Sequence, residues 1–281
     1  MRRINTRKRN KFNIKALNIK TARIIFILLA LILVIFFVYL NFVSTIFIKN
    51  NFEKEYTYLS SLNEATVFSL DKILLFSSAT VNTKDLSNSV WNLDISQFTD
   101  ICVYINNINC NDNQKNIIKE LYLDNFSISK PEYGTPHLYR KSIKDFGICS
   151  FQEDTVISDR LNFNIISTDT DINYSNNEIY NDLSTPISLG FYNKNIKSDF
   201  LYSNSLIEYN GKILKDASIS KTSINCSISF QINIINNLDE KYVCTVSLDI
   251  PFENDNSSIY EDGYITKEIN NLDNYKFLRV K

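Results

Sequence analysis

The chain contains few of the residues on which most catalytic and metal-binding motifs depend. Its 281 residues include 1 His, 1 Met, 1 Trp, 5 Gly and 4 Pro. One histidine excludes a histidine-rich metal site, and no G-x-S-x-G motif accompanies a serine that His137 would activate. Five scattered glycines cannot form a phosphate-binding loop, and the low Gly and Pro content excludes collagen-like and linker-like chains. The sequence therefore predicts no enzyme of these classes.

Acidic residues are absent from the beginning of the chain. Nine of the 30 basic residues lie within residues 1–23, and the first of the 31 acids is Glu53. The chain from Lys49 onward thus holds 21 basic against 31 acidic residues. Because contacts to phosphates need clustered positive charge, this acidic part is not expected to bind nucleic acid.

Charge of either sign is absent from residues 24–48, which predicts a transmembrane helix. A helix needs roughly 20 apolar residues to cross the hydrocarbon core. The basic tail, residues 1–23, places the N-terminus in the cytoplasm by the positive-inside rule. The chain is therefore expected to be a single-pass signal-anchor protein of the cell membrane with its C-terminal part outside. A cleavable signal peptide and a buried core helix are the alternatives.

Two polar segments border this apolar one. Residues 49–66 predict a short juxtamembrane helix or linker, because their apolar residues recur at spacings of 3 and 4. The basic tail is interpreted mainly as a topology determinant beside the inner leaflet. Binding to anionic lipid headgroups, or to nucleic acid inside the cell, are the other interpretations.

Strand patterns dominate from residue 67 onward. Strands are predicted within residues 67–81, 90–107 and 117–128, with polar loops between them. The segment 130–141, with His137 beside proline, is interpreted as a connection or domain boundary. Asn210-Gly211 between two apolar runs predicts a hairpin.

The clearest pattern is a strict alternation of apolar and polar residues in 226–234 and 241–250, which predicts an antiparallel hairpin with one buried face. No amphipathic helix of useful length follows residue 66, so a second sheet is expected to cover that face. The fold class is therefore mainly β, with one or two antiparallel, jelly-roll-like β-sandwich units. The predicted units are residues 67–140 and 141–281.

The 5 cysteines are an odd number, so at least one is unpaired within a monomer. A turn near Leu238 would place Cys226 opposite residues around 250, so we expect no Cys226–Cys244 disulfide. Both are expected to be buried thiols. Cys102 and Cys110 are close enough in sequence to close a small loop, and their pairing stays open.

Candidate ligand-binding residues are few. Trp91, Tyr133 and Tyr139 could stack on sugar rings, as aromatic residues of outer-surface β-sandwiches do. For acid/base catalysis by two carboxylates, the candidates are the acids that lie within strand patterns, namely Asp94, Asp100 and Asp124. No cofactor is expected, although calcium is an alternative at residues 168–173, where two acids lie two positions apart.

Two resemblances guide the functional hypothesis. The strands WNLDISQFTDICVYI and IKELYLDNFSI are similar to paired strands of jelly-roll carbohydrate-binding modules. The whole chain, including SFQINIINN and YVCTVSLDIP, resembles uncharacterised membrane-anchored proteins of low-GC Gram-positive bacteria. These resemblances imply location and architecture. We therefore expect a non-catalytic, membrane-tethered module that contacts envelope glycan or protein. The alternatives are an accessory subunit of a membrane complex and a carboxylate-based glycan hydrolase.

Overall fold

The computed structural model describes residues 24, 27–40, 43, 67–87, 90–108, 117–201, 208–253 and 257–280. The chain divides into two compact units, Met1–Glu64 and Ala65–Lys281. Residues 27–40 are helical with exposed side chains. Among the described residues, no helix is both long and apolar enough to cross a membrane. The remainder of the predicted segment 24–48, the segment 49–66 and Cys110 lie outside the described residues.

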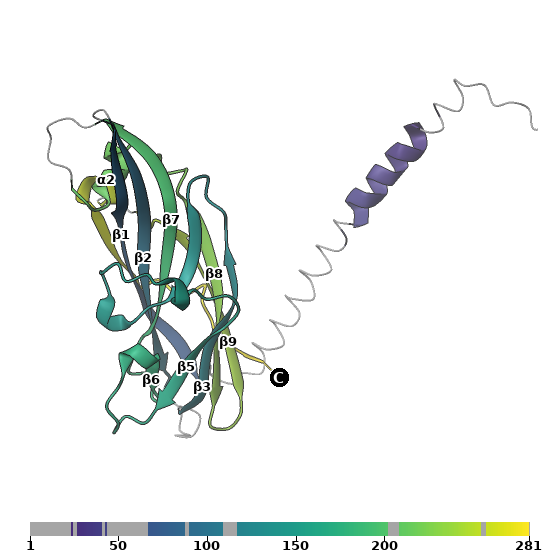
Figure 1. The fold of residues 1–281 in the computed structure, drawn as a ribbon. Coiled ribbons are helices and arrows are strands. Elements are labelled where there is room, and N and C mark those ends of the chain that lie inside the picture. The colour runs from purple at the N-terminus through teal and green to yellow at the C-terminus, as the bar shows by residue number, and fades with distance from the viewer. Residues whose placement is uncertain are drawn as a thin grey trace, which may run out of the picture. The chain divides into compact units, whose positions relative to one another are not determined.

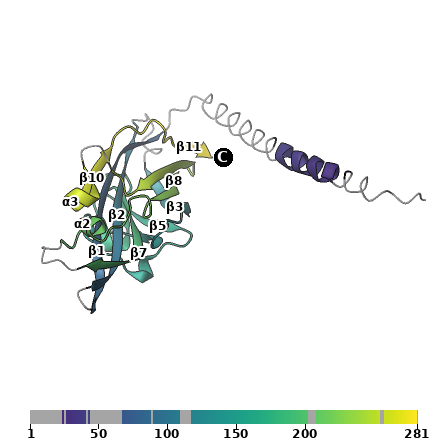
Figure 2. The same cartoon turned by 90° about the horizontal axis from the view of Figure 1, so that it is seen from above.

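The second unit contains two β-sheets that form a sandwich-like fold (Figure 1 and Figure 2). All neighbouring strands of the first sheet are antiparallel. Its order is β10-β1-β2-β7-β4. The strands are β1 (Phe68–Ser87), β2 (Val90–Asn107), β4 (Thr135–Arg140), β7 (Ile187–Leu201) and β10 (Tyr264–Ile269).

The second sheet has the order β11-β9-β8-β3-β5-β6 and is antiparallel except for the β5–β6 pair. Its strands are β3 (Ile118–Ile128), β5 (Leu161–Ile166), β6 (Glu178–Tyr180), β8 (Cys226–Asn236), β9 (Lys241–Ile250) and β11 (Leu278–Val280). Short helices occupy the connections: η1 (Ile143–Asp145), η2 (Glu153–Thr155), η3 (Tyr174–Asn176), α2 (Lys212–Asp216) and α3 (Ile259–Asp262).

The main hydrophobic core lies between the two sheets. Ile101 and Phe191 contribute from the first sheet, and Phe230 and Val246 from the second; all four are fully buried. Alternate residues of each strand face this core because side chains point to opposite faces of a strand. Both sheets contain strands from residues 67–140 and from 141–281, so these two ranges belong to one compact unit.

The predicted C-terminal hairpin is confirmed. β8 and β9 pair with Cys226 opposite Ile250 and Ile232 opposite Cys244. This register separates the two cysteines, and both are buried free thiols, as the alternation predicted. Burial raises the pKa of the Cys244 thiol to about 12, so the thiol is an unreactive part of the core.

Asn210-Gly211 does not form the predicted hairpin. The Asn210 side chain accepts a hydrogen bond from the backbone of Lys212 at 3.0 Å, and Gly211 is the N-cap residue of the short helix α2. A Cβ atom on Gly211 would lie 2.4 Å from Cγ1 of Ile259. The glycine thus allows α2 to approach α3 closely. The local sequence around Asn-Gly is the same for this arrangement as for a hairpin turn, so it cannot distinguish the two.

The segment 130–141 is not only a connection. Its second half forms β4, an edge strand that pairs with β7, and edge strands tolerate a proline such as Pro136. His137 therefore lies on a strand rather than in a loop, half-buried and stacked on Phe151 with 6.2 Å between ring centroids. Burial lowers the pKa of His137.

Candidate functional site

The structure separates the three aromatic residues that the sequence suggested for ligand binding. Trp91 is half-buried at the start of β2, with its ring 6.3 Å from that of Phe200. Tyr139 is fully buried and has no exposed ring face for a sugar. Tyr133 is 45% exposed and lies in the loop before β4. Of the three, Tyr133 is the one with a broadly accessible side chain.

Tyr133 lies at an end of the second sheet where loops meet. Ile128, the last residue of β3, pairs with Ile228, and Cys226, the first of β8, pairs with Ile250, the last of β9. The loop after β3 is fixed to the start of β8 and to the loop before it by backbone hydrogen bonds. Ser129 donates to Ser227 and Tyr133 donates to Ser223, both at 2.8 Å.

A surface hollow of about 380 Å³ opens at this end of the sheet. We call it the loop-end hollow. Tyr133 is hydrogen-bonded to Ser223, the residue next to Thr222 in its lining. The lining combines charged, neutral polar and aromatic side chains: Lys221, Thr222, Asn225, Asp249, Pro251, Phe252 and Glu253.

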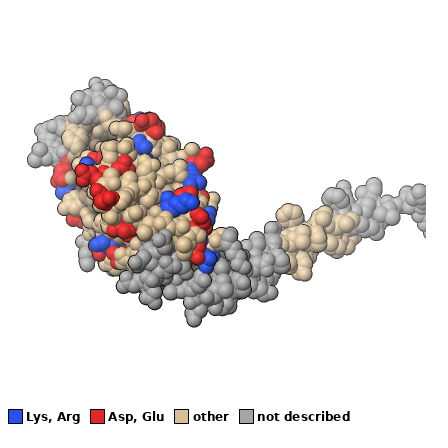
Figure 3. Space-filling view, turned by 90° about the horizontal axis from the view of Figure 1, so that it is seen from below, with Lys and Arg blue, Asp and Glu red and all other residues tan. Residues whose placement is uncertain are grey.

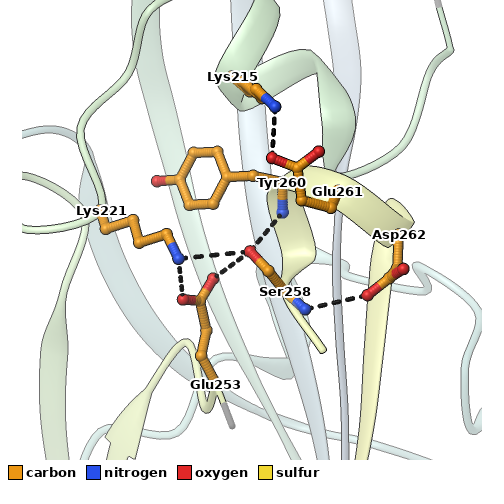
Figure 4. A network of polar contacts seen from close by, with 7 residues as sticks. All are labelled: Lys215, Lys221, Glu253, Ser258, Tyr260, Glu261 and Asp262. Carbon is orange, nitrogen blue, oxygen red and sulfur yellow. Dashed lines mark hydrogen bonds and ion pairs between the residues drawn. The ribbon is translucent and has the colours of Figure 1, made fainter. Parts of the chain in front are cut away.

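One wall of the loop-end hollow is held by a polar network, shown in Figure 4. Lys221 forms an ion pair with Glu253, and the hydroxyl of Ser258 donates to Glu253 at 3.1 Å. The same hydroxyl accepts a hydrogen bond from the backbone of Tyr260 at 3.3 Å and so caps α3. Because these charges already pair with one another, Lys221 and Glu253 chiefly fix the shape of this wall.

The remaining lining residues can contact a ligand. Asn225 and Thr222 are exposed, and Asp249 is oriented by a hydrogen bond of 2.5 Å from the Ser227 hydroxyl. Phe252 is half-buried, with the Lys267 ammonium 5.1 Å from its ring centroid. Amide, hydroxyl and carboxylate groups bind hydroxyls, while a ring supports the apolar face of a sugar. This arrangement suits a neutral polar ligand such as a glycan.

The three carboxylates that the sequence suggested for catalysis lie apart from this hollow. Asp94 pairs with Lys197 at 2.5 Å, and Asp124 accepts a hydrogen bond from Asn233 at 2.8 Å. Asp100 is fully buried on the first sheet. None of them lines the loop-end hollow, so the structure does not assemble them into a pair of catalytic acids.

Asp100 belongs to a buried polar cluster on the face of the first sheet that points away from the main core. The Lys141 ammonium lies 3.0 Å from Oδ1 of Asp100, and the two side chains are 1% and 0% exposed. The backbone N–H of Gly147 donates to Oδ2 of Asp100 at 2.7 Å. Burial outweighs the nearby ammonium and raises the pKa of Asp100 to about 6.

Aromatic side chains and one segment of the chain enclose this cluster. In Figure 1 the segment after β4 passes in front of β1 and β2. Phe151 of this segment stacks on Tyr192 of β7 at 4.1 Å and packs edge-on against Tyr139 of β4. Phe146 packs against Phe76 of β1. The covered ion pair therefore lies inside a small second core, away from solvent.

Replacing Gly190 by alanine is expected to lower the free energy of unfolding by about 1–3 kcal/mol, because it overpacks this second core. A Cβ atom at Gly190 would lie 2.1 Å from a ring carbon of the fully buried Tyr139. Urea denaturation of the purified protein measures the change. The exposed Asn237, replaced by alanine, is the control, and equal midpoints for the two variants would contradict this packing.

Little in the structure supports a calcium site at residues 168–173. Asp169 and Asp171 lie exposed between β5 and η3, and hydrogen bonding to Ser167 lowers the pKa of Asp169. Over the described ranges, no group of three or more His, Cys, Asp or Glu side chains is arranged to hold a metal ion. On the face seen in Figure 3, acidic and basic side chains are interspersed, and neither sign covers it.

Comparison of the chain with protein-family models, with curated proteins and with solved structures finds no match. The sequence pointed to Tyr133 but missed Asn225, Asp249 and Phe252 of the loop-end hollow and, in the separate buried cluster, Lys141. Each of these is an ordinary residue of a strand end or loop, and only the pairing of distant strands brings it to its neighbours.

Proposed function

We propose that this protein is a single-pass membrane protein whose β-rich unit stands outside the cell and binds envelope glycan through the loop-end hollow and Tyr133. The observation that carries the binding role is the composition of the hollow. Exposed Asn225 and Thr222, an oriented Asp249 and the Phe252 ring line one surface depression. Loops at the end of a rigid sheet commonly carry binding residues.

The membrane tether and the location rest on the N-terminal sequence. Residues 24–48 carry no charge, and nine basic residues precede them without an acid. This charge asymmetry favours a cytoplasmic N-terminus and an outer β-rich unit. A tethered module outside the membrane would meet envelope polymer at high local concentration, which relaxes the affinity that one site must supply.

We assign the hollow a binding role without catalysis. A glycan hydrolase needs a carboxylic acid with a raised pKa beside a second carboxylate at the substrate. The carboxyl whose pKa burial raises to about 6 is Asp100, which is enclosed by the segment after β4 and does not line the hollow. Glu253, which does line it, is already paired with Lys221.

Binding of the full chain, in detergent, to isolated envelope and to a panel of its glycans tests the proposal. We expect saturable retention that falls at least about tenfold when Asn225 and Tyr133 are both replaced by alanine, because each glycan contact contributes on the order of 1 kcal/mol. Asn237→Ala, an exposed amide at the opposite end of β8, is the matched control and should bind as wild type.

Three outcomes would contradict the proposal. Folded wild-type protein that is not retained by any envelope fraction would remove the binding role. Retention that Asn225→Ala, Tyr133→Ala and Asn237→Ala leave equally unchanged would place the binding surface elsewhere. Retention that protease treatment of the envelope abolishes would instead identify a protein partner and exclude a glycan.

A further inference from the structure

The Asp100–Lys141 pair has features that an ordinary stabilising ion pair does not need. Both side chains are removed from water, with 0% and 1% exposure. Oδ1 of Asp100 lies 3.0 Å from the ammonium but outside hydrogen-bond geometry. Burial of two charges is unfavourable unless hydrogen bonds satisfy both of them. If the two groups form only an ion pair, hydrogen bonds therefore do not fully offset the cost of burying their charges.

The same geometry suits a reaction between the two groups. Nζ of Lys141 lies 3.0 Å from Oδ1 of Asp100, so the amine is in contact with the carboxyl group that it would attack. Oδ2 accepts a hydrogen bond of 2.7 Å from the backbone N–H of Gly147. A donor in this position would stabilise the negative charge that develops on Oδ2 during attack. Lys141 is itself positioned by donating to the carbonyl of Ile148.

Burial also favours the protonated form of Asp100 that the reaction requires. Water leaves from a carboxylic acid more readily than from a carboxylate, and a dry site favours the uncharged acid. The pKa of Asp100 is raised to about 6 because burial outweighs the attraction of Lys141. The enclosing aromatic rings of Tyr139, Phe151 and Tyr192 exclude water, which would otherwise favour hydrolysis.

We propose that Lys141 and Asp100 form an intramolecular amide cross-link that joins β2 to the residue following β4. One ammonium proton first passes from Nζ to Oδ1 of Asp100, which gives a neutral amine and a carboxylic acid. Nζ then attacks Cγ of Asp100, and a bond between Nζ and Cγ forms while the Cγ–Oδ1 bond breaks. Two of the three ammonium protons leave with Oδ1 as water, and the third stays on the amide nitrogen. Oδ2 becomes the amide oxygen and keeps the hydrogen bond from Gly147. No oxidant, cofactor or second protein is required.

The cross-link would fasten the segment that covers the first sheet. Lys141 lies between β4 and η1, so an amide to Asp100 fixes the point at which the chain leaves β4 and crosses the sheet. In an unfolded chain it would also close the loop from residue 100 to residue 141, which lowers the entropy of that state. Such a link suits a protein held outside the cell, where repair by refolding is not available.

Intact mass spectrometry of the full-length purified chain tests this directly. The expected mass is lower than that of the linear sequence by one water molecule. Trypsin should then fail to cleave after Lys141, and peptide 85–115 should appear joined to peptide 141–144. A full linear mass, or a loss of water located at other residues, would overturn the proposal and leave an ion pair only.

Variants provide the matched comparison. Lys141→Arg keeps the positive charge but removes the nucleophilic amine, so this variant should have the full linear mass. Lys144→Arg changes an exposed lysine three residues later and should keep the deficit of one water. A mass deficit of one water that persists in Lys141→Arg would also overturn the proposal. This outcome can be interpreted even if the variant does not fold, because the mass of a chain does not depend on its fold.

Discussion

Replacement of Asp100 by alanine is expected to lower the free energy of unfolding by about 3–5 kcal/mol, among the largest effects of any single substitution in this chain. The variant leaves the Lys141 ammonium, 1% exposed, without its counter-charge. It also removes the acceptor that holds the backbone of Gly147 and, with it, the segment over the first sheet. Chemical denaturation followed by circular dichroism measures the loss.

A double variant separates the buried charge from the covalent link. Asp100→Ala combined with Lys141→Met removes both charged groups, and apolar replacements of buried ion pairs are often neutral or stabilising. We expect the double variant to recover only part of the stability, because it also lacks the amide. Asp100→Ala within about 1 kcal/mol of wild type would contradict the burial of this pair.

Replacement of Phe230 by alanine is expected to cost a comparable 3–5 kcal/mol, because it leaves a cavity in the core between the two sheets. Phe230 is fully buried in β8, pairs with Val246 of β9, and packs against Phe126 with 6.3 Å between ring centroids. Because both sheets share this core, the whole β-rich unit should still unfold in one transition, at a lower denaturant concentration.

Thr245→Ala is the control for Phe230→Ala. Thr245 lies next to Val246 on the same strand but is exposed, and an exposed substitution of this kind should change stability by less than about 0.5 kcal/mol. Two separate transitions in the Phe230 variant, monitored by the single tryptophan and by far-ultraviolet circular dichroism, would show that the sheets unfold independently. That result would contradict a shared core.

Strand composition and alternation predicted much of the fold. The pattern of residues 226–250 predicted both strands, their buried face and the register that separates Cys226 from Cys244. The strand predicted at the end of the segment 90–107, Ile101–Ile105, is part of the longer strand β2, Val90–Asn107. These predictions succeed because a half-buried strand has a strict two-residue period that a single sequence displays. The predicted two-sheet packing of a mainly β chain is likewise found.

Contacts between distant segments were not predictable in the same way. The strand at Thr135–Arg140 is stabilised by pairing with residues 189–194 of β7, and its Pro and Gly neighbours indicate a loop. Asn210-Gly211 has the local signature of a hairpin, and only its contact with α3 makes it a helix start. Lys141 lies in a segment without periodicity, so nothing in the sequence joins it to Asp100.

External protease treatment of intact cells tests whether the β-rich unit stands outside the membrane. With epitope tags at both ends of the full chain, we expect loss of the C-terminal tag while the N-terminal tag stays protected until the cells are permeabilised. Protection of the C-terminal tag in intact cells, with digestion after permeabilisation, would contradict an outer β-rich unit. That result would place the loop-end hollow where no envelope polymer reaches it.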